Sequence, residues 1–229
     1  MVPVVKQAVH IPVFTKMTPQ LENPIYTAQV MEQGGSDGIC AFSRCLGLDI
    51  DIEKQAPVLH GGYGGHGGPW SIHYALRWIS EMYTKTRLPI SGCGGVVEGD
   101  DVIKYILAGS TAVQVCFLVY AYGYSVVETL NTHLLSYMDR HGYQSTQEFR
   151  GIVTGSRIKS LQEVNREKTL IATVNPDVCV GCRRCTDICI FEGIRYDTEK
   201  KKAFINSQCD GCGLCPSFCP RGAISMIHR

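Results

Sequence analysis

The chain has 229 residues, of which 45% are hydrophobic and 19% are charged, and this composition excludes a disordered or fibrous protein. Its formal net charge of +1 leaves no clustered excess of basic residues, which excludes proteins that bind nucleic acid through its phosphates. The first residues carry no charged region before a long apolar core, so we expect no signal peptide.

Apolar runs of strand length alternate with helical patterns in the first 165 residues. We predict strands over residues 12–17, 37–42, 88–93 and 112–117. We predict helices over residues 23–35, 70–85, 100–110 and 125–142. Strict alternation of this kind predicts parallel βαβ units, and in a (β/α) barrel the strand ends form the active-site face.

Three sequence signals predict helix boundaries. Asp100 is a candidate N-cap with Asp101 in the first turn, and Gly142 is a candidate stop for the long helix before it. Residues 145–148 read STQE, which predicts a capping box and a further short helix.

An uncharged stretch over residues 105–127 is long enough to cross a bilayer. Glycine, serine, threonine and glutamine residues interrupt it, so we predict a helix end, a short strand and a turn instead of a membrane span. We therefore expect a cytoplasmic protein.

Two glycine clusters, over residues 60–70 and 91–100, lie just before predicted helices. Glycine lets backbone N–H groups approach a phosphate closely, and barrels commonly bind phosphate after their seventh and eighth strands. If strands 88–93 and 112–117 hold those places, Gly94 and Gly95 form such a pocket with the backbone of Cys116 and Phe117. Glycine runs also occur as flexible turns, so both interpretations stay open.

The last part of the chain repeats the cysteine spacing C-x2-C-x2-C-x3-C. The two runs are Cys179, Cys182, Cys185, Cys189 and Cys209, Cys212, Cys215, Cys219. This spacing is typical of bacterial two-cluster ferredoxins, in which the fourth cysteine of each run binds the other cluster. We predict one [4Fe–4S] cluster on Cys179, Cys182, Cys185 and Cys219, and a second on Cys209, Cys212, Cys215 and Cys189. Zinc sites and disulfides fit the duplicated spacing less well.

The segment between the two runs predicts a small hairpin. Apolar residues alternate around the charged turn at residues 197–202. Ile190 stands where the first run would usually carry proline, which should alter the turn more than the ligation. Arg183 and Arg184 either raise a cluster potential, meet a redox partner or form a solvated face. We place the domain boundary between residues 165 and 166.

Motifs from both parts carry a family resemblance. The runs IPVFTKMTP, GGSDGICAF, GGHGG, ALRWI, ISGCGGV and IKYILAGSTAVQVC occur in this order, over about residues 5–225 with the cysteine runs. This order is similar to the C-terminal half of the FMN barrel of the dihydroorotate dehydrogenase superfamily, especially to dihydropyrimidine dehydrogenases, which also carry a two-cluster ferredoxin tail. The resemblance implies an α/β fold: the C-terminal half of a (β/α)8 TIM-type barrel at 1–165, and a small α+β bacterial-type ferredoxin domain at 166–229.

The resemblance also implies which residues bind FMN. Lys16 matches a lysine that contacts the flavin ring and stabilises negative charge on its reduced edge. Gly64 and Gly65 match a flavin-contacting glycine pair. The expected FMN-binding residues are Lys16, Ser43, Gly64, Gly65, Gly94, Gly95, Cys116 and Phe117.

The substrate residues depart from the family pattern. Dihydropyrimidine dehydrogenases have Asn-Thr after the sixth strand, where this chain has Ser43 and Arg44. Loss of an amide and gain of a cation disfavour a pyrimidine and suit an anionic substrate, so Arg44 is the expected substrate residue unless it faces solvent. His66 replaces an apolar residue and is either structural or near the flavin.

A full barrel needs eight strands and about 250 residues, whereas only four strands are predicted here. We therefore expect another chain to supply the first half of the barrel, together with the general base, which in the family is a cysteine or serine on a loop there. Accordingly, the cysteines of the first part are expected to be small buried residues and not the base. They are Cys40, Cys45, Cys93 and Cys116.

These observations predict a dihydropyrimidine/dihydroorotate dehydrogenase-like oxidoreductase. Hydride would pass between FMN and a small organic substrate, and electrons would pass through two [4Fe–4S] clusters to a redox partner subunit or soluble carrier. The alternative is a non-catalytic electron-transfer subunit that contains no flavin. A flavin-free structural scaffold would leave the glycine loops and Lys16 without a role.

Overall fold

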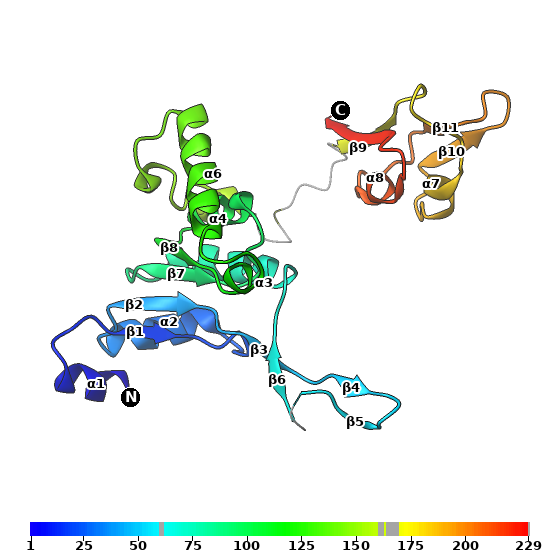
Figure 1. Cartoon of the computed structure of the whole chain (residues 1–229). Coiled ribbons are helices and arrows are strands. Elements are labelled where there is room, and N and C mark those ends of the chain that lie inside the picture. Colours follow the sequence, from blue (N-terminus) through cyan, green and yellow to red (C-terminus); the bar gives the residue numbers. More distant parts are fainter. Residues whose placement is uncertain (60–61, 160–162, 164–169, 229) are drawn as a thin grey trace. The chain divides into compact units, whose positions relative to one another are not determined.

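The computed structural model describes residues 1–59, 62–159, 163 and 170–228 of the chain. The chain divides into two compact units, Met1–Lys159 and Ser160–Arg229, and each has its own buried core (Figure 1). The predicted boundary between residues 165 and 166 lies outside the described residues.

The first unit is an α/β structure built on one parallel sheet. Its helices are α1 (Val2–Ala8), α2 (Pro24–Gln33), α3 (Ser71–Tyr83), α4 (Gly99–Leu107), α5 (Phe117–Tyr122) and α6 (Val126–His141), followed by the 3-10 helices η1 (Thr146–Glu148) and η2 (Gly155–Arg157). Its strands are β1 (Phe14–Lys16), β2 (Gly38–Ala41), β3 (Cys45–Gly47), β4 (Ile50–Asp51), β5 (Ala56–Pro57), β6 (Gly64–His66), β7 (Ile90–Cys93) and β8 (Ala112–Gln114). Strands β1, β2, β7 and β8 pair in parallel in that order.

The four predicted strands and four predicted helices are all present, with shorter bounds. The strand predicted over residues 112–117 is wrong at its end, because it stops at Gln114 and Phe117 already begins α5. The uncharged stretch is thus divided among α4, β8 and α5. No helix in the described part of the chain is long and apolar enough to cross a bilayer.

The two faces of the parallel sheet are covered differently. Helices α2, α3 and α4 contact β2, β7 and β8, and the side chains on that face include the buried Ile39 and Ile90. Lys16, Cys40 and Cys93 lie on the opposite face by strand alternation and register, and they are half-buried or exposed. Helices on one face of a parallel sheet fit a partial TIM barrel, whose helices form the outer ring.

Helix ends follow the local sequence, with one correction. Asp100 is not the N-cap of α4; that position is Glu98, and Asp101 completes the capping box with it. Asp101 is preferred because its carboxylate accepts the N–H groups of Val97 and Glu98, at 2.9 and 3.3 Å. The predicted stop at Gly142 is confirmed by a φ of 73°, and the capping box at residues 145–148 is confirmed in η1.

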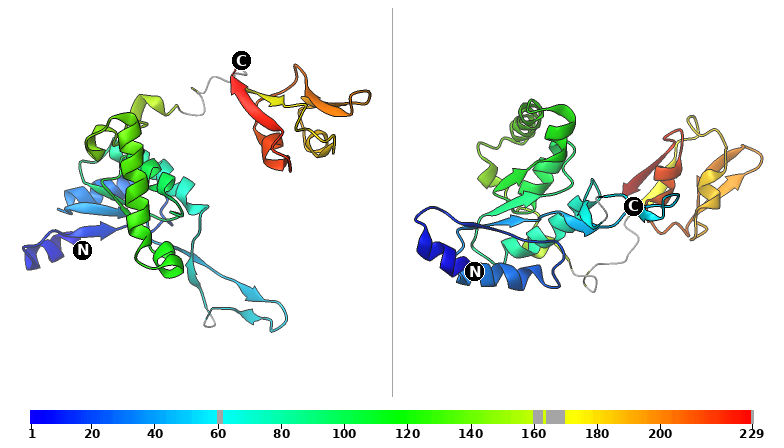
Figure 2. Two further views of the ribbon diagram at one scale, coloured as in Figure 1. Left: turned by 45° about the horizontal axis from the view of Figure 1, so that its top comes forward. Right: turned by 60° about the horizontal axis from the view of Figure 1, so that its bottom comes forward.

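An antiparallel ribbon between β2 and α3 was not predicted. Strand β3 pairs with β6 and β4 pairs with β5, and we call residues 45–59 and 62–66 the arm. The arm extends away from the parallel sheet (Figures 1 and 2). Apolar and acidic residues alternate along its first half. Leu46, Leu48, Ile50 and Ile52 share one face and are 50–79% exposed.

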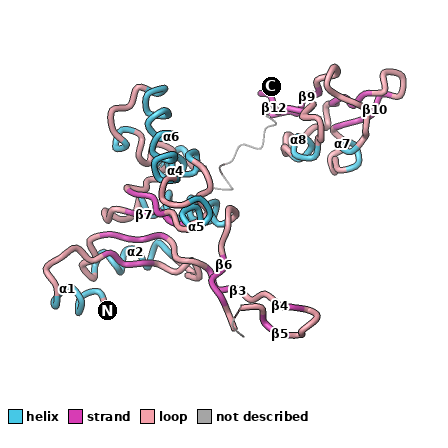
Figure 3. Tube along the Cα trace, in the orientation of Figure 1, coloured by secondary structure: helices cyan, strands magenta, loops and turns pink. Residues whose placement is uncertain are grey.

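The second unit contains two antiparallel strand pairs and two short helices. Its elements are β9 (Leu170–Val174), α7 (Arg184–Asp187), β10 (Ile194–Asp197), β11 (Lys202–Ile205), α8 (Leu214–Phe218) and β12 (Ile224–His228). The predicted hairpin is confirmed, with Ile194 opposite Ile205. Strand β9 pairs with β12, and α7 and α8 each follow the second cysteine of a run (Figure 3).

Candidate functional site

The carboxyl ends of the parallel strands bring several predicted residues to one edge of the sheet. Lys16 ends β1, where its Cα pairs with that of Cys40 in β2, and Cys93 ends β7. The Ser43 N–H donates to the Met17 carbonyl at 2.7 Å, which ties the segment after β2 to the segment after β1. These backbone bonds hold Lys16 and Ser43 at the edge where active sites of parallel α/β folds form.

Electrostatic interactions link Lys16 to three thiols at this edge. Burial raises the pKa of Cys93, the Lys16 cation opposes that rise, and Cys116 and Cys40 add to it. Lys16, Cys40 and Cys116 therefore each lie close enough to Cys93 to influence it.

The expectation that the cysteines of the first part are buried is wrong. Cys40, Cys45 and Cys93 are half-buried and Cys116 is exposed. The physical reason for Cys40 and Cys93 is that they lie on the sheet face that the helices leave uncovered, whereas Cys45 lies on the arm.

The turn after β7 has a backbone that only glycine adopts easily. Gly94 and Gly95 have φ angles of 115° and 71°, and the Tyr105 hydroxyl donates to the Gly94 carbonyl at 2.6 Å. A Cβ on Gly95 would lie 2.5 Å from the Ile72 nitrogen, so the first turn of α3 packs directly against this turn. Burial raises the pKa of Tyr105, which keeps its hydroxyl protonated as a donor.

Cys116 and Phe117 lie at the start of α5, just beyond the carboxyl end of β8. Cys116 is the N-cap residue and Phe117 the first helical residue, 67% exposed. Turns after two adjacent strands, followed by a short extra helix, form the usual phosphate site of TIM barrels. The Gly94–Gly95 turn, the Lys16 cation and the short helix α5 fit a bound FMN.

Gly64 and Gly65 lie in strand β6 of the arm. A Cβ on Gly65 would collide with Arg44, so the structure brings Arg44 and Gly65 together. The side chain nearest to Gly64 is Leu59, and neither glycine has Lys16 among its nearest neighbours. Arg44 is exposed, and the His66 ring lies 5.6 Å from that of Trp70, which supports a structural role for His66.

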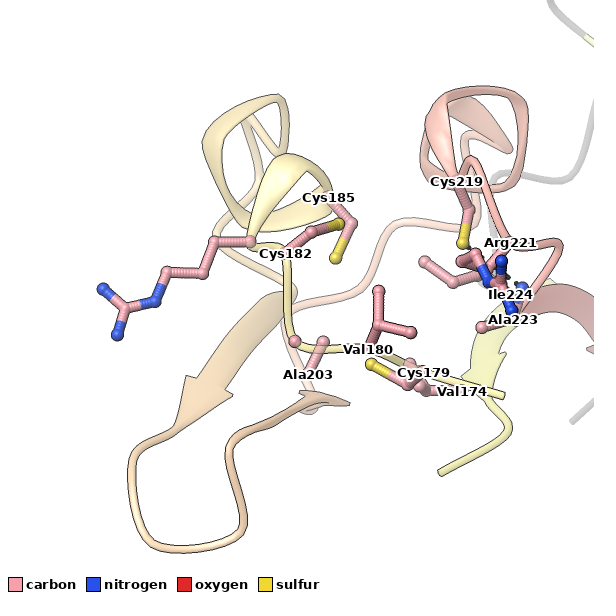
Figure 4. A pocket seen from close by; sticks show the side chains of 12 residues that line it. Val174, Cys179, Val180, Cys182, Cys185, Ala203, Cys219, Arg221, Ala223 and Ile224 are labelled. Atoms are coloured by element: carbon pink, nitrogen blue, oxygen red, sulfur yellow. Dashed lines mark hydrogen bonds between the residues drawn. The ribbon is translucent and has the colours of Figure 1, made fainter. Parts of the chain in front are cut away.

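In the second unit, cysteines from both runs meet around one pocket. Cys179, Cys182 and Cys185 of the first run line it together with Cys219 of the second (Figure 4). The remaining walls are mostly apolar, and two arginines also line the pocket. These other lining residues are Val174, Val180, Gly181, Arg183, Ala203, Arg221, Ala223 and Ile224.

The pKa shifts of the buried Cys185 and the half-buried Cys215 each involve the other three cysteines of a predicted set. Burial raises the pKa of Cys185, and its cysteine neighbours that raise it further are Cys179, Cys182 and Cys219. Burial raises the pKa of Cys215 to about 11, and here the contributing cysteines are Cys209, Cys212 and Cys189. Buried thiols with raised pKa values do not ionise alone, whereas bound iron favours the thiolate.

In the described part of the chain, no three His, Cys, Asp or Glu side chains are grouped to hold a single metal ion.

Two glycines that the sequence analysis did not single out shape the cysteine loops. Gly181 and Gly211 have φ angles of 69° and 75°, and a Cβ on either would collide with a backbone carbonyl, that of Lys201 or Leu170. Their shared place in the two runs was the signal that could have identified them. Backbone N–H groups also donate to ligand sulfurs, from Ala172 to Cys209 at 3.5 Å and from Ala223 to Cys219 at 3.2 Å.

Comparisons with known proteins give a match for each part of the chain. Residues 1–138 match the family model of dihydroorotate dehydrogenase, and residues 172–226 match the model of a 4Fe-4S dicluster domain. Proteins of the first family bind FMN, and the second domain binds two [4Fe–4S] clusters. The cofactors predicted from the sequence are thereby confirmed.

Three relatives span different parts of the chain. The NAD-dependent dihydropyrimidine dehydrogenase subunit PreA of Escherichia coli (strain K12) is 30% identical over 235 residues, which cover 97% of this chain and 57% of the relative. The catalytic subunit of dihydroorotate dehydrogenase B (NAD(+)) of Methanocaldococcus jannaschii is 35% identical over 134 residues, 58% of this chain and 44% of that one. Dihydroorotate dehydrogenase A (fumarate) of Limosilactobacillus reuteri is 39% identical over 112 residues, which cover 49% of this chain and 36% of that relative. The chain thus spans 57% or less of the length of these relatives.

Proposed function

The chain belongs to the dihydroorotate dehydrogenase family and carries a 4Fe-4S dicluster domain, and from this we propose that it is part of a flavin- and iron–sulfur-dependent oxidoreductase. Bound FMN would supply hydride transfer with a small organic substrate, and two bound clusters would supply single-electron transfer to a redox partner subunit or soluble carrier. The observation that carries this proposal is the arrangement of Lys16, the Gly94–Gly95 turn and Cys116 at one edge of the parallel sheet.

In this proposal the sheet edge holds the flavin. Lys16 places a cation at the end of β1, where it stabilises negative charge on the ring. Gly94 and Gly95 let the backbone approach the phosphate, and the start of α5 closes the pocket. The proposed FMN residues are Lys16, Ser43, Gly64, Gly65, Gly94, Gly95, Cys116 and Phe117.

Arg44 is proposed as the substrate residue. Its guanidinium presents several N–H donors in a fixed plane, which suits a carboxylate or another anionic group on a small, unsaturated or pyrimidine-like substrate. Its side chain lies against Gly65, where glycine leaves it room to cross the ribbon. Exchange of Arg44 for a neutral residue should therefore raise the KM for an anionic substrate more than it lowers kcat.

The eight cysteines of the second unit are proposed as the cluster ligands. One set is Cys179, Cys182, Cys185 and Cys219, and the other is Cys209, Cys212, Cys215 and Cys189. The common pocket of the first set and the coupled thiols of both sets support this assignment. Cluster chemistry of this kind suits the reducing cytoplasm.

We further propose that the sheet is the C-terminal half of a barrel and that another chain segment supplies the remaining strands and the general base. Among the described residues, β1 pairs only with β2 and β8 only with β7, so both sheet edges are open. Parallel sheets are normally covered on both faces, and open edges favour pairing with further strands. The exposed apolar face of the arm is proposed to pack against the same segment.

Purification of the native complex with cofactor analysis tests the proposed function. We expect flavin absorbance together with iron and acid-labile sulfide at about eight each per chain. Clusters without flavin would support the alternative, a non-catalytic electron-transfer subunit. Absence of both flavin and a chain with a first-half barrel would refute the proposal.

A matched pair of lysine variants links the flavin to Lys16. Lys16→Met should slow reduction of the flavin by substrate by about a hundredfold, because it removes a charge that stabilises the reacting ring. Lys85→Met removes an exposed lysine just beyond α3 and should leave the rate unchanged. Equal rates in the two variants would show that Lys16 is not part of the flavin site.

A further inference from the structure

The second unit is an internal repeat, and its two halves can be compared position by position. Gly181 and Gly211 occupy the same turn with φ angles of 69° and 75°, and α7 and α8 begin at Arg184 and Leu214. From Cys179 to Glu192, each residue therefore corresponds to the one 30 positions later. Because the backbone is shared, differences between matched side chains act on otherwise similar surroundings.

Positive charge gathers around the first set of ligands, Cys179, Cys182, Cys185 and Cys219. Arg183 and Arg221 line its pocket, Arg221 is labelled there in Figure 4, and Arg184 is adjacent to Cys185 in the sequence. Lys202 adds a fourth cation, since its Nζ donates to the Cys179 carbonyl at 2.5 Å. Against these stands Asp177, two residues before Cys179.

The matched positions around the second set, Cys209, Cys212, Cys215 and Cys189, carry no cation. The residues that correspond to the arginines Arg183, Arg184 and Arg221 are Gly213, Leu214 and Phe191. Asp210 corresponds to Val180, and Asp187, two residues before Cys189, corresponds to Ser217. Glu192 next to this set forms an ion pair with Arg195, so these two charges largely cancel.

Two other influences are shared by the two sets. Each set receives one backbone N–H at a cysteine sulfur, that of Cys209 or Cys219. The first cysteine of each run is buried and the second is exposed. The arginines that line the pocket of the first set have no counterpart at the matched positions of the second.

Arg183 is held in place by its backbone and by an aromatic ring. Its φ is 65°, a left-handed conformation that its counterpart Gly213 adopts without strain, and its guanidinium carbon lies 4.1 Å from the centre of the Tyr196 ring. The contact thus fixes the guanidinium over the Tyr196 ring.

We infer that Arg183 and Arg221 make the cluster on Cys179, Cys182, Cys185 and Cys219 the one with the higher reduction potential. Reduction adds one negative charge to a cluster, so nearby cations stabilise the reduced form and nearby carboxylates destabilise it. An electron on the second cluster moves to the first: the second is oxidised by one electron, the first is reduced by one, and no bond forms or breaks. This inference rests on the proposed ligation of two clusters.

Redox titration followed by electron paramagnetic resonance of the full chain, in its native complex, tests the inference. Arg183→Gly and Arg221→Phe install the residue of the other repeat. Each should lower the more positive of the two midpoint potentials, by roughly a tenfold change in the electron equilibrium between the clusters, and leave the other potential in place.

Charge-preserving variants separate charge from structure. Arg183→Lys and Arg221→Lys should keep the potentials close to those of the unchanged chain, and Arg221→Gln should lower the potential even if Arg183→Gly fails to assemble. Unchanged potentials in Arg221→Gln, or a shift confined to the more negative cluster, would overturn the inference while leaving the proposed function intact. A native complex without two clusters would instead refute the proposed ligation, and the inference with it.

Discussion

Gly95 is a position where one missing side chain determines whether two elements can meet. Its φ of 71° is left-handed, and a Cβ there would lie 2.5 Å from the Ile72 nitrogen at the start of α3. Gly123 has a similar φ of 77°, but nothing lies within 4 Å of its Cβ position. The two glycines therefore separate backbone strain from close packing.

Alanine substitutions at these glycines should affect FMN differently. Gly95→Ala adds a collision to a left-handed strain of about 1–2 kcal/mol, which should displace the turn and lower FMN content at least tenfold. Gly123→Ala carries the strain alone and should retain FMN. The ratio of flavin to iron in the purified complex measures the effect, and equal ratios in both variants would argue against a flavin at this turn.

The contribution of Asp101, at the start of α4, to the stability of the fold depends on pH. Its side chain is 6% exposed; burial acts to raise its pKa, but the Val97 N–H and the Lys104 ammonium outweigh burial and hold the pKa below 3.8. A lowered pKa means that the ionised carboxylate stabilises the fold. This contribution is complete above pH 3.8 and is lost as the pH falls through the lowered folded-state value.

Asp101→Asn should therefore lower the free energy of unfolding by about 1–2 kcal/mol at neutral pH. Urea unfolding followed by circular dichroism should show this difference at pH 7 and a smaller one below pH 3. A constant difference across this range would mean that the charge of Asp101 plays no part.

Helix ends could be predicted from the sequence where the residues at the end itself determine its conformation. Gly142 and the box at residues 145–148 gave the ends of their helices, because left-handed glycine and reciprocal capping are local. The N-cap prediction at Asp100 was wrong because α4 begins earlier, with Glu98 as the N-cap and Asp101 as the N3 partner of its capping box. The contact of Gly95 with α3 depends on tertiary structure, which spacing alone does not contain.

The repeated cysteine loops are built from elements whose turns require glycine. Gly181 packs on the Lys201 carbonyl, whereas Gly213, with a φ of 75°, has no atom within 4 Å of its Cβ position. Both glycines lie within the cysteine runs of the same unit. They therefore form a natural pair for testing how close packing holds a cluster loop.

Gly181→Ala should reduce iron and sulfide content in the purified complex, because the added methyl pushes the first loop away from the Lys201 carbonyl. Gly213→Ala has the same left-handed strain of about 1–2 kcal/mol without the collision and should retain most of its iron. Iron and sulfide assays compare the two. Similar losses in both variants would show that strain, and not packing, controls loading.

Helices and strands with a strong apolar periodicity could be predicted from the sequence. The short helix α5 and the short strands of the arm could not. The four helices and four strands around the parallel sheet follow from alternating apolar patterns. Helix α5 has six residues within an apolar run, which cannot be distinguished from a strand by periodicity. The arm was hidden because β4 and β5 have two residues each and its glycines resemble a plain loop.

The first unit exposes apolar surface on one side of the arm. Leu46, Leu48, Ile50 and Ile52 are at least half exposed, and carboxylates lie on the other side of the same strand segment. A two-stranded ribbon is marginally stable alone, so an apolar face of this size indicates a partner surface. The proposed occupant is the segment that completes the barrel.

Ile50→Asp should weaken association of the chain with that segment, because it places an unpaired charge within an apolar contact. Ile50→Val keeps the face apolar and should copurify with the partner as the unchanged chain does. Pull-down from the native source, with the partner identified by mass, measures both variants. Retention of the partner by Ile50→Asp would exclude the arm from the contact.

The crossing of the fourth cysteines has a consequence for the whole second unit. In the proposed ligation, Cys189 belongs by sequence to the first run and by chemistry to the second cluster, and Cys219 shows the reverse. The polypeptide and the iron–sulfur bonds then connect the two repeats independently. A protease cut in the exposed turn at residues 198–201 would leave the fragments joined by the Fe–S bonds of Cys189 and Cys219 and by the β9–β12 and β10–β11 pairings, so removal of the iron should weaken their association.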